Sequence, residues 1–300
     1  MKKIIFLLSC FLLFLYIIFS LLDLEAERVV WQLYSRSNGI INGAEDIAYE
    51  NNHKKALIFI HGHMETAGIW RDMVEKSRAL DKFDAHALLL PYHGRDLKTA
   101  TKLDNEIIYK YLKQSIQYLS KKYDSITVVG LSYGGLLLAK LAKNNDIPTK
   151  VNVVLYSPAT HIISNDILGF CKVFFYTKLF RTYCNYENLG CGYPVYESTD
   201  EGGRKFLEKE INLRYRVMPA ILAMYNLDRE TRGVIEKIKR PFFIIAAKDD
   251  NRVNYPTIMN ECRSNKQCKE ISFLSGKHMI HYGKHREEFF KILQKIVTNK

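Results

Sequence analysis

Residues 128–135, which read VVGLSYGG, place a serine between two glycines, with an apolar run on each side. The run that ends at Gly130 is rich in β-branched residues and predicts a buried strand, and a helical pattern follows from Leu136. A serine on so sharp a strand-to-helix turn needs small residues two places away on both sides, because its backbone is strained. The turn exposes the Ser132 hydroxyl at a helix N-terminus, where the helix dipole favours negative charge. The stretch therefore predicts a nucleophilic serine, and a plain tight turn is the alternative.

Two later strand ends carry the partners that such a serine needs. A serine hydroxyl requires a base, and the base requires an orienting acid. The apolar run 242–246 leads into Asp249 and Asp250, and the last apolar run leads into His278. Ligand sites of open parallel sheets lie beyond the carboxyl ends of the strands. The order serine, acid, histidine therefore predicts a triad of Ser132, His278 and one of these two aspartates.

Short apolar runs alternate with helical patterns after Lys54, which predicts an α/β fold with a mostly parallel sheet flanked by helices. The runs are nearly continuous, as in strands that are buried on both faces. Strands are expected at 56–60, 85–90, 126–129, 151–156, 242–246 and 271–273, and helices at 69–80, 105–122, 136–144, 256–262 and 285–297.

The segment 161–238 interrupts this alternation, because it has no clear strand pattern and is rich in Tyr and Phe. We interpret it as a mainly helical cap, whose aromatic side chains form its own core, line a substrate pocket, or do both. The pocket candidates are Phe174, Phe175, Tyr176 and Phe180. The expected division of the chain is an N-terminal segment 1–25, a first core part 26–160, the cap 161–238 and a second core part 239–300.

The N-terminus carries an apolar run from Ile4 to Leu22 behind two lysines. As a helix, this run is close to the ~30 Å of a bilayer core. It ends in acidic residues without a small-residue cleavage site, which favours an uncleaved signal anchor over a cleaved signal peptide. The lysines before the run keep the N-terminus cytoplasmic and place the rest of the chain on the outer, periplasmic or extracellular side. A secreted form, released by signal cleavage, is the alternative.

The net charge of +12 has no dense basic run, which argues against a nucleic-acid partner and fits a mild attraction to anionic membranes. Two close cysteine pairs, Cys184–Cys191 and Cys262–Cys268, are candidate disulfides, which an oxidising compartment permits. Neither pair has the two-residue spacing of a structural zinc site. Nothing in the chain indicates a metal or a cofactor.

Five motifs together resemble the α/β-hydrolase superfamily over about residues 40–300, and within it the monoacylglycerol lipase and lysophospholipase group of serine aminopeptidase-type hydrolases. They are His61-Gly62-His63, residues 91–95 (PYHGR), residues 130–134 (GLSYG), the strand from Pro241 through Asp250, and residues 276–278 (GKH). The resemblance implies a cap inserted after the sixth strand of the sheet. It also implies Asp250 as the acid, with Asp249 as the rival, although Ala247 replaces a glycine of the family pattern.

The resemblance further implies an oxyanion hole built from the backbone N–H groups of Tyr133 and His63, with Met64 as the less favoured second donor. It implies a serine ester hydrolase that works through an acyl-enzyme. The aromatic cap and the N-terminal anchor suggest that the ester is lipid-like. Acyl transfer or carbon–carbon bond hydrolysis on the same triad is one alternative, and a non-catalytic binding protein is another. Of the remaining histidines, His61 is expected to brace its turn, and His281 and His285 are expected at a helix entry or on the surface.

Overall fold

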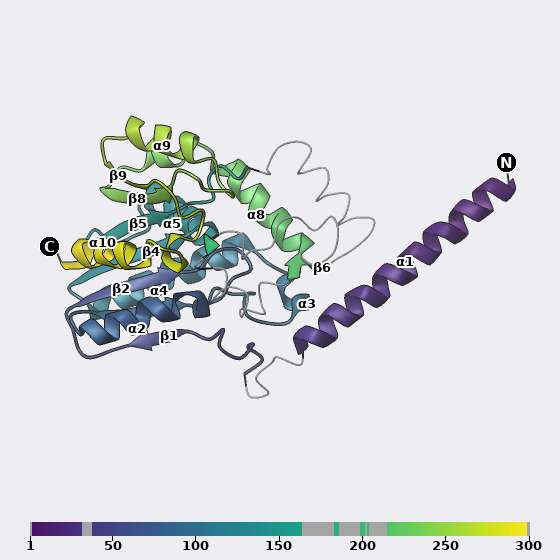
Figure 1. Cartoon of the computed structure of the whole chain (residues 1–300), viewed down its shortest axis with the longest axis horizontal. Coiled ribbons are helices and arrows are strands. Elements are labelled where there is room, and N and C mark those ends of the chain that lie inside the picture. The colour runs from purple at the N-terminus through teal and green to yellow at the C-terminus, as the bar shows by residue number, and fades with distance from the viewer. Residues whose placement is uncertain are drawn as a thin grey trace.

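The structure, a computed structural model of the chain, describes residues 2–31, 38–163, 183–185, 199–201, 203 and 215–298. Its centre is a seven-stranded sheet with the order β1-β3-β2-β4-β5-β8-β9 (Figure 1). β1 is antiparallel to β3, and the other neighbours in this sheet are parallel, which confirms the predicted α/β class. The strands are β1 (Ile47–Tyr49), β2 (Lys55–Ile60), β3 (Asp84–Leu88), β4 (Ser125–Leu131), β5 (Val151–Tyr156), β8 (Phe242–Ala247) and β9 (Cys268–Phe273).

Helices cover both faces of this sheet and enclose a hydrophobic core on each. α4, α5 and α9 contribute to the core of one face, and α2 and α10 contribute to the core of the other. The predicted ends of these five helices agree with the observed ends to within three residues. The first two residues of the predicted helix 69–80 belong to a 3₁₀ turn that precedes α2. Their bounds are α2 (Arg71–Leu80), α4 (Asn105–Lys122), α5 (Tyr133–Lys143), α9 (Tyr255–Ser264) and α10 (Arg286–Thr298), with shorter elements at η1 (Ala67–Trp70), α3 (Leu97–Ala100), η4 (Ile235–Lys237) and η5 (Ile280–Tyr282).

The segment 161–238 contains strands, which the sequence analysis did not expect. β6 (Tyr183–Asn185) pairs with β7 (Tyr215–Val217) in a separate antiparallel sheet, and β7 leads into α8 (Met218–Glu230). Strands of three residues are too short to show an alternating pattern, so the sequence analysis did not find these two. In the described residues the segment follows β5, the fifth strand in chain order.

The N-terminal helix α1 (Lys2–Trp31) projects away from the sheet (Figure 1). Its stretch Ile4–Glu25 is long and apolar enough to cross a membrane, and none of it is buried against the rest of the protein. A signal sequence near the N-terminus meets the same criterion of length and apolar composition. The C-terminal part of α1 contacts α3 and β6.

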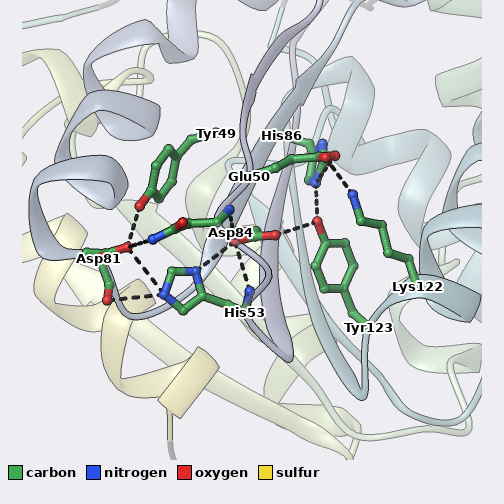
Figure 2. A network of polar contacts seen from close by, with 9 residues as sticks. Tyr49, Glu50, His53, Asp81, Asp84, His86, Lys122 and Tyr123 are labelled. Atoms are coloured by element: carbon green, nitrogen blue, oxygen red, sulfur yellow. Dashed lines mark hydrogen bonds and ion pairs between the residues drawn. The ribbon is translucent and has the colours of Figure 1, made fainter.

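A polar network closes the amino ends of the parallel strands (Figure 2). The carboxylate of Asp84 at the start of β3 is fully buried, and it accepts the Asn51 N–H at 2.9 Å and the Tyr123 hydroxyl at 2.9 Å. The His53 ring lies 2.7 Å from the same carboxylate. Burial alone would raise the pKa of Asp84, but these donors hold it below its ordinary value. The network therefore joins the β1–β2 loop, β3 and the end of α4 through the Asp84 carboxylate, whose charge is stabilised by these hydrogen bonds. Around it, Figure 2 shows Tyr49, Glu50, Asp81, His86 and Lys122.

A disulfide joins Cys262 at the end of α9 to Cys268 at the start of β9. The sulfur atoms lie 2.04 Å apart, and the two residues are separated by six positions in the sequence. The bond attaches a covering helix to the edge strand of the sheet. In the other candidate pair, Cys184 is part of β6 but Cys191 lies outside the described residues. The four aromatic pocket candidates also lie outside the described residues.

Candidate active site

Ser132 lies on the turn between β4 and α5, where the backbone is strained. Its φ is +53°, in the left-handed region that non-glycine residues rarely adopt. A Cβ on Gly130 would lie 2.6 Å from the Gly134 carbonyl oxygen, and a Cβ on Gly134 would lie 2.5 Å from the His61 carbonyl oxygen. Both glycines are therefore required by close approach of backbone to backbone. The Ser132 N–H donates to the Tyr156 carbonyl at 2.9 Å, which holds the turn against the end of β5.

His278 and Asp250 form a buried pair on the loops that follow β9 and β8. Nδ1 of His278 lies 2.9 Å from Oδ2 and 3.1 Å from Oδ1 of Asp250. The side chains are 5% and 0% exposed. Asp250 also accepts the N–H groups of Arg252 at 2.8 Å and Val253 at 3.1 Å, so its carboxylate is fixed in one orientation. A carboxylate that accepts from Nδ1 leaves Nε2 free to take a proton.

The rival acid Asp249 has a different environment. Its carboxylate accepts the backbone N–H of Lys277 at 3.0 Å and contacts solvent. The geometry thus pairs His278 with Asp250, whereas Asp249 supports the loop one residue before the histidine.

His61 braces the turn at the end of β2. Its Nε2 accepts the Leu90 N–H at 3.0 Å, so the proton is on Nδ1, which donates to the Gly62 carbonyl at 2.8 Å. Burial, together with the neighbouring His93, holds the pKa of His61 well below its ordinary value, so the ring is neutral. The ring therefore connects the turn after β2 to the end of β3, which is the bracing role that the sequence predicts.

The residues expected to supply the oxyanion hole, His63 and Tyr133, are neighbours in space. Their rings meet edge to face with centroids 5.9 Å apart, and both lie near His93. Burial lowers the pKa of His93 to about 4, so the His93 ring is uncharged at neutral pH. Met64, the alternative donor, has a φ of +58° in the same turn. The turn after β2 and the N-terminus of α5 thus lie side by side at the carboxyl edge of the sheet.

His281 is not the surface or helix-entry residue that we expected. It is 2% exposed, stacks on Trp70 with ring centroids 4.4 Å apart, and its Nδ1 lies 3.0 Å from the Tyr156 hydroxyl. Burial lowers its pKa to about 3. The prediction was wrong because η5 turns the chain back onto the core, and a turn of three residues has no periodicity to read. His285 lies before α10 and pairs with Glu288 at 3.1 Å, which agrees with a helix entry.

Glu65 is a buried carboxyl group of the site that the sequence analysis missed. It is 5% exposed, and its Oε2 accepts the Gly62 N–H at 2.6 Å. Burial raises its pKa to about 7, although the Gly62 N–H and the positive charges of His278 and Arg252 act in the opposite direction. The available signal was a lone acid two residues after the His61-Gly62-His63 motif.

No metal-binding cluster of three or more His, Cys, Asp or Glu side chains is present among the residues that the structure describes. Ser132 and the His278–Asp250 pair have the chain order and the sheet positions of a Ser-His-Asp triad.

Comparison with known families agrees with this geometry. Residues 57–292 match the alpha/beta hydrolase family, so the chain belongs to it. It is an α/β hydrolase similar to esterases and lipases. A carboxylesterase of Bacillus subtilis (strain 168) is 25% identical over 252 residues, which are 81% of this chain and 93% of that protein.

Solved structures of lipases share the fold. The monoacylglycerol lipase of Paleococcus ferrophilus matches with a TM-score of 0.66 and 15% identity, over 84% of this chain and 97% of that one. A soluble variant of the monoglyceride lipase from Saccharomyces cerevisiae matches with a TM-score of 0.68 and 12% identity, over 85% and 91% of the two chains. The expected membership of the superfamily is confirmed.

Proposed function

We propose that the protein is a serine ester hydrolase that cleaves lipid-like acyl esters at a membrane surface. The observation that carries the proposal is the buried His278–Asp250 pair at the sheet edge that also presents Ser132 on its strained turn. The similarity to a carboxylesterase supports ester cleavage as the reaction.

The proposed reaction begins when Ser132 Oγ attacks the ester carbonyl carbon and His278 Nε2 takes its proton. Asp250 holds the ring through Nδ1 and stabilises the imidazolium that forms. The new oxyanion accepts hydrogen bonds from the backbone N–H groups of His63 and Tyr133, each of which is worth about 10²–10³-fold in kcat in comparable sites. The ester C–O bond then breaks, and the leaving alcohol takes the proton from His278. Water repeats the cycle on the acyl-enzyme and releases the carboxylic acid.

Three features support a membrane location outside the cytosol. Helix α1 has the length and composition of a membrane span. The Cys262–Cys268 disulfide fits an oxidising compartment. The end of α1 contacts α3 and β6, which lie toward the carboxyl ends of the strands (Figure 1). These contacts support an arrangement in which the active-site side of the molecule faces the membrane, so that an ester in the bilayer has a short path to Ser132.

The test uses the full-length protein in detergent micelles. A fluorophosphonate probe should label the wild type but not Ser132→Ala. The wild type should hydrolyse p-nitrophenyl esters and monoacylglycerols, with kcat/KM rising from short to long acyl chains. Equal labelling of both proteins would contradict the nucleophile, and a preference for acetyl esters would contradict a lipid-like substrate. An acylated acceptor in place of free acid among the products would indicate acyl transfer.

A further inference from the structure

Glu65 closes the turn that precedes the expected oxyanion donor. Its carboxylate accepts the Gly62 N–H at 2.6 Å, and its own N–H lies 3.4 Å from the Gly62 carbonyl oxygen. A Cβ on Gly62 would lie 2.7 Å from Oε2 of Glu65, so the carboxylate lies directly against the glycine. Gly62 and Glu65 thus hold the two ends of the turn 62–65 together through two hydrogen bonds, and His63 and Met64 lie between them.

This turn needs support, because its backbone is strained. Met64 has a φ of +58°, which costs about 1 kcal/mol or more for a residue that is not glycine. A charge-assisted hydrogen bond is about twice as strong as a neutral one and can hold such a conformation. The carboxylate is on the residue next to Met64, where it restrains the strained part of the turn.

The carboxylate also faces the charged part of the site. The titratable and charged groups that act on it are His278 on the loop after β9 and Arg252 on the loop after β8. From β5, the Tyr156 phenol faces it, since the charges of Glu65 and Asp250 both raise the pKa of that phenol. Glu65 is therefore a second carboxyl group near the imidazole, in addition to Asp250.

We propose that Glu65 is a positioning residue of the oxyanion hole: its ionised carboxylate fixes the turn 62–65, and protonation loosens the turn and lowers the rate. The inference rests on the proposed Ser132–His278–Asp250 triad. It acts through the backbone and does not require Glu65 to touch the substrate.

Because burial raises the pKa of Glu65 to about 7, this control operates near neutral pH. Above that pH the carboxylate is ionised and the turn is held. As the pH falls through about 7 the carboxylate takes a proton and the charge-assisted hydrogen bond from Gly62 is lost. His278 must also be unprotonated to act as a base, so two protonations lower the rate on the acid side.

The experiment measures kcat/KM against pH for the wild type, Glu65→Gln and Glu65→Asp, with Asp84→Asn as a matched control. Asp84→Asn also replaces a buried carboxylate with an amide, but it lies at the opposite end of the sheet. For the wild type, kcat/KM should fall by about fivefold more than the protonation of His278 alone causes, as the pH falls through about 7. Glu65→Gln keeps an oxygen for the Gly62 N–H but cannot ionise, so its profile should lack this additional fall. Asp84→Asn should keep the wild-type profile.

The rates above pH 8 separate positioning from charge. Glu65→Gln should lose about fivefold in kcat with little change in KM, because it exchanges a charge-assisted hydrogen bond for a neutral one. Glu65→Asp keeps the charge, but its shorter side chain cannot reach Gly62, so it should lose about 10²-fold in kcat. Affinity for a trifluoromethyl ketone, which forms a tetrahedral adduct with the serine, should fall by the same factors as kcat/KM.

The possible failures can be told apart. A wild type without esterase activity or probe labelling would overturn the proposed function. If the wild type is active and Glu65→Gln has the same kcat and the same pH profile, the role of Glu65 alone would be overturned. A rise in KM with unchanged kcat would assign Glu65 to substrate binding and would also overturn the positioning role.

Discussion

Replacing Glu65 with Gln should change how stability depends on pH. The pKa of this carboxyl group rises from 4.5 in the unfolded chain to about 7 in the folded protein. The folded state therefore holds the proton more tightly, and between these two values stability falls as the pH rises. Each pH unit in this interval corresponds to about 1.36 kcal/mol, so the ionised carboxylate costs about 3 kcal/mol above pH 7. Glu65→Gln removes this cost, because the amide does not titrate.

The assay is urea unfolding of the full-length protein in micelles, followed by tryptophan fluorescence from pH 4.5 to pH 8. The difference in unfolding free energy between Glu65→Gln and the wild type should move in favour of the variant by about 3 kcal/mol across this range. Asp84→Asn is the control of opposite sign. Hydrogen bonds hold the pKa of Asp84 below its unfolded value, so its contribution is present at neutral pH and is lost as the pH falls through the folded pKa.

A pH-independent difference between Glu65→Gln and the wild type would refute the reasoning, because it would show that the carboxyl group has the same pKa in both states. A difference that favours the wild type at high pH would mean that the charges of His278 and Arg252 outweigh burial. Either result would also remove the physical basis for pH control of the oxyanion turn.

Three further predictions concern the site and its supports. Asp250→Asn should lose about 10³–10⁴-fold in kcat, because His278 loses the acceptor for its Nδ1, whereas Asp249→Asn should lose less than about 10-fold. The reverse order in a p-nitrophenyl ester assay would move the acid to Asp249. Reduction of the Cys262–Cys268 bond should lower the free energy of unfolding by about 2 kcal/mol, the loop-entropy value for so short a loop, and an unchanged urea midpoint would contradict this. Gly134→Ala should cost about 1–3 kcal/mol of stability and most of the activity, because its Cβ meets the His61 carbonyl; a fully active variant would show that the turn can move.

The sequence predicted the parts of the molecule that repeat a pattern over many residues. The buried runs of β2 and β5 and the long amphipathic α4 have periods that are set by burial, so their positions follow from the spacing of apolar residues. The order of Ser132, Asp250 and His278 at strand ends also follows from the sequence, because parallel strands bring their carboxyl ends to one edge.

What the sequence did not show depends on contacts between distant short segments. β6 and β7 pair across a long interval, and neither has enough residues to display alternation. The burial of His281 depends on how η5 packs against Trp70, which no local pattern records. The role of Glu65 was missed for the same reason, since its raised pKa is caused by burial and by charges from two later loops.

Two of the buried carboxylates, Asp84 and Glu65, show why the two ends of the sheet differ. At the amino ends, the loops supply Asp84 with the Asn51 N–H, the Tyr123 hydroxyl and the His53 ring, and its pKa falls. At the carboxyl ends, the proposed chemistry requires that a backbone N–H of the turn 62–65 point at the substrate oxygen. Such a donor cannot also serve the carboxylate, so Glu65 is buried with less compensation and its pKa rises. The stability cost of Glu65 and its proposed role in catalysis thus have one cause, a turn whose donors are directed toward a ligand.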